Sequence, residues 1–382
     1  MSEVCVAMVG IGGYGGWYLR ELLPHAAQHG VRVVAGIDAF PERSPWLRGL
    51  QEAGIPIFTS LEDFYRRETA DLVVNSAPIH LHAPLTMAAL RHGSNVLCEK
   101  PLCARLDEAD RMAEAEHQAG KFVAIGYQWS FSDAIQAIKR DVLAGRFGRP
   151  LKMKSLILWP RALSYYWRNA WAGHVRTAEG DWVYDSPVNN ATAHYLHNML
   201  YLLGDSQATS AWPETIEARL WRANDIENYD TAFLHVVTAG GVDVQMFTAH
   251  PVPNEIGPLA SYEFEDALLE YDMEQRTFRA RFRSGQVEDY GDPDATQYNK
   301  LWHSVDAVRS RAKPVCGIDA SRPHTEIVNR LQALEVQTFP AAQIVREARG
   351  EDTLVWVSGL QEALERAYTE GALPPKENRT SA

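Results

Sequence analysis

Short apolar runs alternate with helical patterns along the first third of the chain. Runs of this length, bounded by turn residues, predict strands buried on both faces, as in a parallel sheet. The predicted strands cover residues 4–9, 31–37, 55–58, 72–74, 95–98 and 122–125, and the predicted helices cover residues 17–23, 46–53, 61–68, 84–92 and 106–118. This alternation predicts a doubly wound parallel sheet, which binds ligands beyond the carboxyl ends of its strands.

The pattern changes after residue 126. From residue 215 to residue 290, short segments alternate apolar and polar positions around turns such as Ala239-Gly240-Gly241, which is typical of an antiparallel sheet. The other elements expected here are a strand over 151–158 and helices over 129–147, 188–203, 297–311, 326–337 and 352–370. One face of the sheet is expected to be uncovered and to serve as a surface for oligomerisation.

The chain of 382 residues is long enough for two domains, each with its own core. We predict an N-terminal Rossmann domain over residues 1–126. A C-terminal α+β domain with a large, mostly antiparallel sheet is predicted over residues 127–372, and a disordered tail over 373–382.

A glycine-rich turn directly follows the first predicted strand. Gly10, Gly12 and Gly15 form the pattern G-x-G-x-x-G between that strand and the next helix. In this setting the first glycine makes a tight turn, the second lets the backbone approach a pyrophosphate, and the third permits close packing of helix and strand. The free N–H groups at the helix start favour phosphate. The stretch therefore predicts a dinucleotide site.

Asp38 ends the second predicted strand, a little over twenty residues beyond the glycines. A carboxylate at this place hydrogen-bonds the ribose hydroxyls of adenosine and repels a 2′-phosphate, so NAD is expected rather than NADP. Two alternatives stay open. Asp38 could merely cap a loop, and the nearby Arg43 could accommodate a 2′-phosphate.

The charge and the cysteines restrict the class of protein. The net charge of −12 argues against nucleic-acid and anionic-membrane partners. The four cysteines have no C-x-x-C spacing, which fits reduced thiols in the cytoplasm. We expect no signal peptide, because the first strand begins at Val4, and no apolar run approaches membrane-spanning length. The protein is therefore expected to be cytoplasmic.

Aromatic and basic residues are interleaved over residues 159–187, and polar residues follow in the next predicted helix. Aromatic faces stack on sugar rings, and arginine or asparagine binds hydroxyls or carboxylates; the alternative is that about half of these aromatics form core. At 100° per residue, one stripe of the helix 188–203 carries Asn190, His194, His197 and Tyr201. Such a stripe would present imidazole and amide groups to a cleft.

Residues 4 to about 205 resemble the Gfo/Idh/MocA family, which includes glucose-fructose oxidoreductase and inositol dehydrogenase. The motifs that carry the resemblance are Gly10-Ile11-Gly12-Gly13-Tyr14-Gly15, Asp38, Pro78-x-x-x-His82, Glu99-Lys100-Pro101, Trp167-Arg168 and the His194 segment before Leu203-Gly204. The second half resembles the family in its strand-rich pattern only. The resemblance implies NAD as cofactor, a carbohydrate or polyol substrate, and a homodimer or homotetramer formed through the C-terminal sheet.

The resemblance also implies roles for particular residues. His194 is the expected general base, since imidazole has a suitable pKa near pH 7, and Lys100 would stabilise the alkoxide. Further substrate contacts are expected from Asn190, His197, Trp167, Arg168, Asn169, Trp171 and Tyr127. Cofactor contacts are expected from Gly10, Gly12, Gly13, Tyr14, Gly15, Asp38, Ser76, Pro78, His82, Glu99, Lys100, Trp167 and Arg168. For His82 a structural role is the open alternative.

The sequence departs from the family pattern at three positions. Ile79 stands where the family usually has Asn, Asn190 stands in place of an Asp, and His197 stands in place of a second Asp. Asp185 could supply the missing carboxylate or merely satisfy a turn. The spacing His194-x-x-His197 lacks a third ligand, so no metal is expected.

Three functions remain open. The first is an NAD-dependent oxidoreductase acting on a sugar, glycoside or cyclic polyol. The second is a redox glycosidase that uses tightly bound NAD transiently, through oxidation and elimination. The third is a non-catalytic sensor of NAD or sugar, against which the presence of both Lys100 and His194 argues.

Overall fold

The computed structural model describes residues 2–372, which form two compact units. The first unit contains residues up to 132 together with residues 294–322, and the second contains residues 133–293 and the chain from 323 onward. The predicted boundary at residue 126 therefore needs correction. Residues 127–132 and a segment from the last third of the chain belong to the first unit. The predicted tail over 373–382 lies outside the described residues.

The first unit is built on a six-stranded parallel sheet of order β3-β2-β1-β4-β5-β6. Its strands are β1 (Val4–Val9), β2 (Val31–Ile37), β3 (Ile57–Phe58), β4 (Leu72–Asn75), β5 (Asn95–Cys98) and β6 (Val123–Ile125). Its helices are α1 (Gly15–His25), η1 (Pro41–Arg43), α2 (Leu47–Glu52), α3 (Leu61–Tyr65), α4 (Ile79–Arg91), α5 (Leu106–Ala119), η2 (Gln128–Phe131) and α9 (Asn299–Ser310). The predicted fold class is confirmed.

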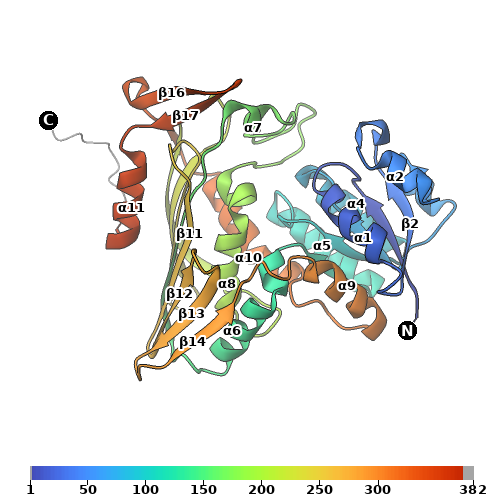
Figure 1. Cartoon of the computed structure of the whole chain (residues 1–382), viewed down its shortest axis with the longest axis horizontal. Helices are drawn as coiled ribbons and strands as arrows, with labels where there is room; N and C mark the ends of the chain where they lie inside the picture. Colours follow the sequence, from blue (N-terminus) through green and yellow to red (C-terminus); the bar gives the residue numbers. More distant parts are fainter. Residues whose placement is uncertain (1, 373–382) are drawn as a thin grey trace. The chain divides into compact units, whose positions relative to one another are not determined.

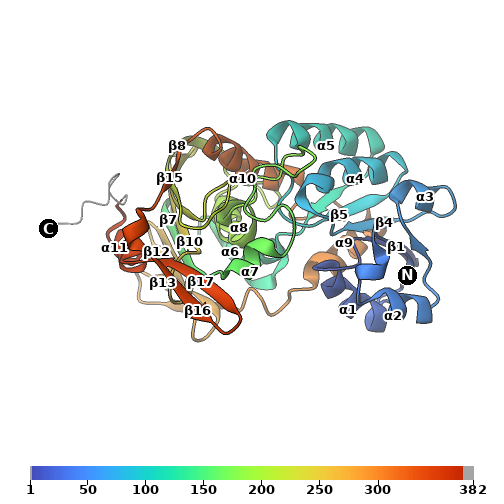
Figure 2. The same ribbon diagram turned by 90° about the horizontal axis from the view of Figure 1, so that it is seen from above.

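Helices cover both faces of this sheet. Figure 2 shows α3, α4 and α5 on one face and α1, α2 and α9 on the other. The strands are buried on both sides, and β4 and β5 are buried at every residue. This explains why they appear in the sequence as continuous apolar runs rather than alternating ones.

Helix α4 begins five residues earlier than predicted, so Pro84 lies inside it. Proline usually begins a helix because it lacks an N–H group. Here contacts with the rest of the unit hold the first turns: the side-chain amide of Asn75 donates to the carbonyl of His82 at 3.2 Å, and the His82 ring is itself bonded on both sides. Tertiary contacts therefore override the local signal.

The second unit is built on a nine-stranded mixed sheet of order β14-β13-β12-β11-β7-β10-β9-β8-β15. The pairs β7–β10 and β8–β15 are parallel, and the other pairs are antiparallel. Its strands are β7 (Pro150–Leu158), β8 (Pro213–Arg222), β9 (Thr231–Thr238), β10 (Asp243–Ala249), β11 (Ile256–Phe264), β12 (Ala267–Asp272), β13 (Thr277–Phe282), β14 (Val287–Gly291) and β15 (Val336–Thr338). A separate hairpin pairs β16 (Ile344–Arg349) with β17 (Asp352–Val357).

The helices of the second unit are α6 (Asp133–Leu143), α7 (Leu163–Trp167), η3 (Pro187–Ala191), α8 (Ala193–Leu202), η4 (Ala341–Gln343) and α11 (Leu360–Glu370). The boundary between the units falls within α10 (Ile318–Leu331). Figure 1 shows α6 and α8 on one side of the large sheet and α11 on the other. Leu360, Leu364 and Ala367 of α11 share a core with sheet residues such as Phe247.

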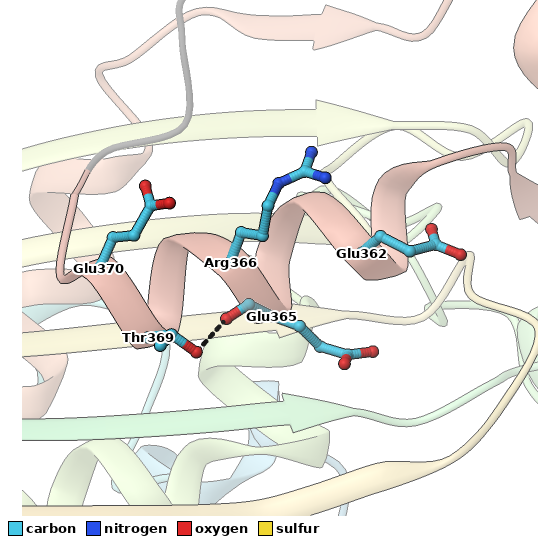
Figure 3. A pocket seen from close by; sticks show the side chains of 5 residues that line it. All are labelled: Glu362, Glu365, Arg366, Thr369 and Glu370. Carbon is cyan, nitrogen blue, oxygen red and sulfur yellow. Dashed lines mark hydrogen bonds between the residues drawn. The ribbon is translucent and has the colours of Figure 1, made fainter.

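The C-terminal part corrects three predictions. The helix expected over 326–337 is α10, which spans Ile318–Leu331, and residues 336–338 form β15. The helix expected over 352–370 divides into β17 and α11, and α11 covers part of the sheet face that was expected to be bare. The solvent side of α11 has a shallow pocket lined by mostly charged side chains, namely Glu362, Glu365, Arg366, Thr369 and Glu370 (Figure 3). None of the candidate site residues borders this pocket.

Over residues 2–372, no helix is both long enough and apolar enough to cross a membrane. The same residues contain no group of three or more His, Cys, Asp or Glu side chains placed to hold a metal ion.

Candidate functional site

The glycine-rich turn combines tight packing with open space. Gly10 has φ +79, and a Cβ there would lie 2.8 Å from the carbonyl oxygen of Ser76. A Cβ on Gly15 would lie only 1.8 Å from the carbonyl oxygen of Gly10. By contrast, a Cβ on Gly12 or Gly13 would meet no atom within 4 Å. The turn is therefore packed at its two ends and open in the middle, where a dinucleotide loop has to receive its ligand.

The side chains of Asp38 and Ser44 hydrogen-bond to the backbone of the glycine-rich turn. The Asp38 carboxylate accepts the N–H of Ile11 at 3.1 Å and the N–H of Phe40 at 3.0 Å, and the Ser44 hydroxyl donates to the carbonyl of Ile11 at 2.7 Å. Asp38 thus does support the loop. Each carboxylate oxygen keeps further capacity to accept a hydrogen bond, so this role and a ribose contact are compatible. Arg43 lies over the Phe40 ring at 4.3 Å.

The turn Glu99-Lys100-Pro101 follows β5 at the same edge of the sheet. Glu99 is 5% exposed, and its carboxylate accepts the Lys100 N–H at 3.1 Å and the Tyr18 hydroxyl at 2.5 Å. The Lys100 side chain is partly exposed. The peptide bond between Lys100 and Pro101 is cis. A buried carboxylate therefore anchors the backbone of Lys100, whose side chain is partly exposed.

His82 connects two of the loops at this edge. One ring nitrogen lies 2.7 Å from the carbonyl oxygen of Pro101, and the other lies 2.9 Å from that of Ala77. The side chain is 1% exposed. The structure thus favours the structural alternative over direct cofactor contact. In the same loop, the Ser76 hydroxyl is buried and has no hydrogen-bond partner within the described residues, and Pro78 is exposed just before α4.

These observations fit NAD. The open backbone at Gly12 and Gly13, the N-terminus of α1, the unbonded Ser76 hydroxyl and the Asp38 carboxylate all lie on loops at the carboxyl edge of the parallel sheet. Tyr14 stands at the N-terminus of α1 and is 42% exposed. These are the backbone N–H donors, the carboxylate acceptor and the accessible backbone that a dinucleotide needs.

In the second unit, one buried carboxylate lies beside two of the residues predicted to bind substrate. Asp185 is 2% exposed and accepts the Asn190 side-chain amide at 2.8 Å and the N–H of Gly173 at 2.7 Å. An Arg168 nitrogen lies 3.8 Å from the oxygen that accepts the Gly173 N–H. The Arg168 guanidinium lies 3.7 Å from the centre of the Tyr165 ring and 5.5 Å from that of Trp171. Asp185 therefore satisfies a turn and also supplies a carboxylate beside Asn190.

The other residues of this loop are placed differently. The Asn169 side chain accepts the N–H of Trp171 at 3.1 Å, which fixes the start of the Trp171 segment. Trp167 is 73% exposed, more than any other large apolar side chain of the described residues. A side chain this exposed has room to cover a ligand.

The helix predicted over 188–203 is interrupted. Residues Pro187–Ala191 form the π-type turn η3, Thr192 leaves helical geometry with φ −113, and α8 starts at Ala193. The Ser186 hydroxyl accepts the N–H of Asn189, and the Thr192 hydroxyl donates to the carbonyl of Pro187. Because of this break, Asn190 is out of register with α8.

The predicted polar stripe is therefore wrong beyond His194. His197 is 1% exposed and stacks on the fully buried ring of Tyr201 at 5.8 Å, and the Tyr201 hydroxyl accepts the Gln136 amide. Burial lowers the pKa of His197 well below its usual value. Tyr127, in the first unit, is also fully buried. His197 and Tyr127 are core residues rather than substrate contacts, whereas His194 in the first turn of α8 is partly exposed.

His250 makes the stability of the second unit depend on pH. Its ring is fully buried beside Arg161 and Arg168, and burial followed by the nearby Arg161 charge lowers its pKa to about 3. The unfolded chain binds a proton at the usual 6.5, so unfolding takes up a proton between these values. The free energy of unfolding should therefore fall by about 1.4 kcal/mol per pH unit from about pH 6.5 downward.

Urea unfolding at several pH values checks this prediction. His250→Asn keeps a donor for the Trp159 carbonyl, which the His250 ring contacts at 2.9 Å, but it cannot titrate. Its stability should fall with pH less steeply than that of the wild type, by about one proton. His117→Asn, at an exposed position on α5, is the control and should keep the wild-type slope. Equal slopes for His250→Asn and the wild type would contradict the prediction.

Comparison with known proteins defines the family. A model described as "Oxidoreductase family, NAD-binding Rossmann fold" matches residues 4–127. Inositol 2-dehydrogenase of Rubrobacter xylanophilus is 33% identical over 151 residues, which are 39% of this chain and 42% of that protein. The protein of Amycolatopsis mediterranei named "Putative UDP-kanosamine synthase oxidoreductase subunit" is 30% identical over 263 residues, 64% of this chain and 68% of that protein. The chain belongs to the Gfo/Idh/MocA family.

A solved structure extends the likeness of the fold to both units. Levoglucosan dehydrogenase, in its complex with NADH and levoglucosan, matches with a TM-score of 0.71 over 87% of this chain and 97% of that one, at 14% identity. The match to Rubrobacter inositol 2-dehydrogenase spans only about two fifths of that relative's length. The resemblance to the Gfo/Idh/MocA family that was inferred from the sequence is confirmed. The NAD-binding Rossmann fold of the first unit is confirmed as well.

The sequence suggested Asp185 as a carboxylate near Asn190, and the structure places Asp185 beside Asn190 and Arg168. One contact in this Gfo/Idh/MocA protein had no signal in the sequence, the ion pair between Glu99 and Lys300. Lys300 is 201 residues away from Glu99 and lies in a segment that predicts an ordinary helix.

Proposed function

We propose that this protein is an NAD-dependent oxidoreductase that acts on a hydroxyl group of a sugar, glycoside or cyclic polyol. The observation that carries the proposal is the Lys100 turn, anchored by a buried carboxylate at the same sheet edge as the open glycine turn. NAD, when bound, supplies the hydride acceptor.

The residues predicted for substrate binding and catalysis, apart from the buried His197 and Tyr127, then have the following tasks. His194 takes the hydroxyl proton, since imidazole is a common general base and this side chain is partly exposed. The Lys100 ammonium stabilises the negative charge that develops on the substrate oxygen. Arg168 and Asn190, both held by Asp185, bind substrate hydroxyls or a carboxylate, and Asn169, Trp167 and Trp171 complete the substrate contacts. The cytoplasmic location and the homodimer or homotetramer remain predictions.

Two measurements test the proposal. Purified protein is first assayed for bound NAD(H) by mass and absorbance, and a panel of sugars, glycosides and polyols is then scored for NADH formation. Sustained NADH formation on any of these compounds supports the proposal. Release of an aglycone without net NADH would replace it with the redox glycosidase. NAD binding without turnover of any kind would favour a sensor.

Asp38 should set the preference between the two nicotinamide cofactors. Asp38→Ala removes the carboxylate that binds ribose hydroxyls and repels a 2′-phosphate, so the affinity for NAD should fall about tenfold or more, while that for NADP falls less or rises. Both dissociation constants are measured by NADH and NADPH fluorescence. Because Asp38 also supports Ile11, Asp38→Asn is the control for loop structure. An equal loss for both cofactors in Asp38→Ala would show that the carboxylate does not contact the ribose.

A further inference from the structure

Lys300 is a buried lysine that none of the roles above uses. It is the second residue of α9, within the first unit, and its side chain is 0% exposed. Its ammonium donates to the Glu99 carboxylate at 2.5 Å, to the Tyr14 hydroxyl at 3.0 Å and to the Gly126 carbonyl at 3.4 Å. The rings of Tyr14, Trp17 and Tyr18 surround it at 4.6 to 5.1 Å.

These partners come from three separate loops. Tyr14 belongs to the glycine-rich turn after β1, Glu99 belongs to the turn after β5, and Gly126 follows β6. All three loops lie at the carboxyl edge of the sheet, where ligands of such folds bind. One ammonium therefore connects the predicted phosphate loop to the turn that carries Lys100.

A gain in stability does not by itself explain why Lys300 and Glu99 are paired in the interior. Burial lowers the pKa of Lys300, and the adjacent Glu99 carboxylate opposes this shift. The desolvation of two buried charges commonly cancels most of their attraction, and well-packed apolar residues often serve equally well. The geometry offers a different reason. The Glu99 carboxylate contacts Lys300 and Tyr18 through one oxygen and the Lys100 N–H through the other.

We propose that Lys300 is a positioning residue for Lys100, acting through Glu99, and that it also steadies Tyr14 for the cofactor. This inference rests on the proposed role of Lys100. Without the Lys300 ammonium, the Glu99 oxygen keeps only the Tyr18 hydroxyl as a donor, so the carboxylate is less firmly oriented and anchors the Lys100 backbone less well. Small displacements of a catalytic group can lower a rate by about 10²-fold.

The test compares Lys300→Met with Lys139→Met. Lys139 is also fully buried, but it lies in the second unit, where its ammonium donates to the carbonyls of Tyr201 and Gly204 at the end of α8. Both variants remove a buried ammonium, so both should lower thermal stability. Only Lys300→Met should lower kcat, by about 10²-fold, while the substrate KM changes by less than about threefold. Equal effects of the two variants on kcat would overturn the inference.

A double variant keeps the test informative if Lys300→Met does not fold. Glu99→Gln combined with Lys300→Met removes both buried charges and should recover thermal stability. The amide that Glu99→Gln introduces could still accept the Lys100 N–H, but its orientation would no longer be fixed by an ammonium. The kcat value should therefore stay low. Recovery of kcat together with stability would mean that Lys300 only neutralises Glu99, and would overturn the inference.

Cofactor binding separates this inference from the proposed function. NADH affinity, measured by fluorescence without any substrate, should fall about fivefold in Lys300→Met because Tyr14 loses a hydrogen bond. If the wild type oxidises no compound of the panel, the proposed function fails, but the NADH affinity still tests whether Lys300 steadies Tyr14 for the cofactor. In that case, an unchanged NADH affinity of Lys300→Met would overturn the inference.

Discussion

Replacing Lys100 with methionine should lower turnover about 10³-fold while the protein still binds NADH. Methionine is close to lysine in length and flexibility but carries no charge. The variant therefore removes the group that stabilises the developing oxyanion, and the loss of a single such group costs about 10² to 10³ in kcat. Glu99 keeps its contacts with Tyr18 and Lys300, so the fold and the NADH affinity should change little.

The control for this experiment lies on the same sheet. Lys121 is a partly exposed lysine just before β6, so it lies at the amino edge, whereas Lys100 follows β5 at the carboxyl edge. Lys121→Met should keep wild-type kcat. His194→Ala should lose most activity and, like Lys100→Met, still bind NADH. Turnover close to the wild-type value in either Lys100→Met or His194→Ala would refute the mechanism.

Gly15→Ala should destabilise the first unit severely, whereas Gly12→Ala should leave it folded. The added Cβ at position 15 would lie 1.8 Å from a backbone oxygen, which cannot yield without moving α1 or β1. Overpacking a well-packed interior costs typically about 1–3 kcal/mol of the free energy of unfolding, and a contact this short with backbone is expected at the upper end of that range. At position 12 the Cβ meets no atom, so stability should stay within about 1 kcal/mol of the wild type.

The two glycine variants separate packing from ligand binding. Guanidinium unfolding measures stability, and NADH fluorescence measures affinity. Gly12→Ala should lose about tenfold or more in NADH affinity, because its methyl group occupies the space through which the backbone meets the pyrophosphate. Unchanged affinity in Gly12→Ala would contradict the assignment of this turn as the phosphate site. A stable Gly15→Ala protein would contradict the packing argument.

Periodicity and glycine punctuation were sufficient to predict the parallel sheet of the first unit from sequence, but not the segment 294–322 that completes the unit. Buried parallel strands are short apolar runs, and the strands at residues 4–9, 31–37 and 95–98 agree residue for residue with the structure. Such runs are local signals. The prediction of one continuous helix over 188–203 was wrong because the Ser186 and Thr192 side chains hydrogen-bond to nearby backbone groups. These bonds compete with the backbone hydrogen bonds of a helix. The two hydroxyls flank the π-type turn, where a count of 100° per residue no longer applies.

The missed ion pair is a long-range contact. The pairing of Glu99 with Lys300 spans 201 residues, and neither residue departs from what its own segment predicts. The burial of His197 likewise depends on its neighbours in space, since a histidine beside Leu196 fits an amphipathic surface as well as it fits a core. A single sequence reports the local pattern, and partners at this distance become visible only in the folded chain.

The order of the chain has a consequence for its synthesis. Residues 133–293 are inserted into the first unit, which needs residues 294–322 for completion. Until that late segment leaves the ribosome, the nascent Glu99 carboxylate lacks its ammonium partner, and Ala124 of β6 lacks its bridge to Gly317. Domains generally fold from the N-terminus as they emerge. Here the second unit is largely synthesised before the first can close, so a fragment ending at residue 132 would carry the whole parallel sheet and yet keep an unneutralised charge inside it.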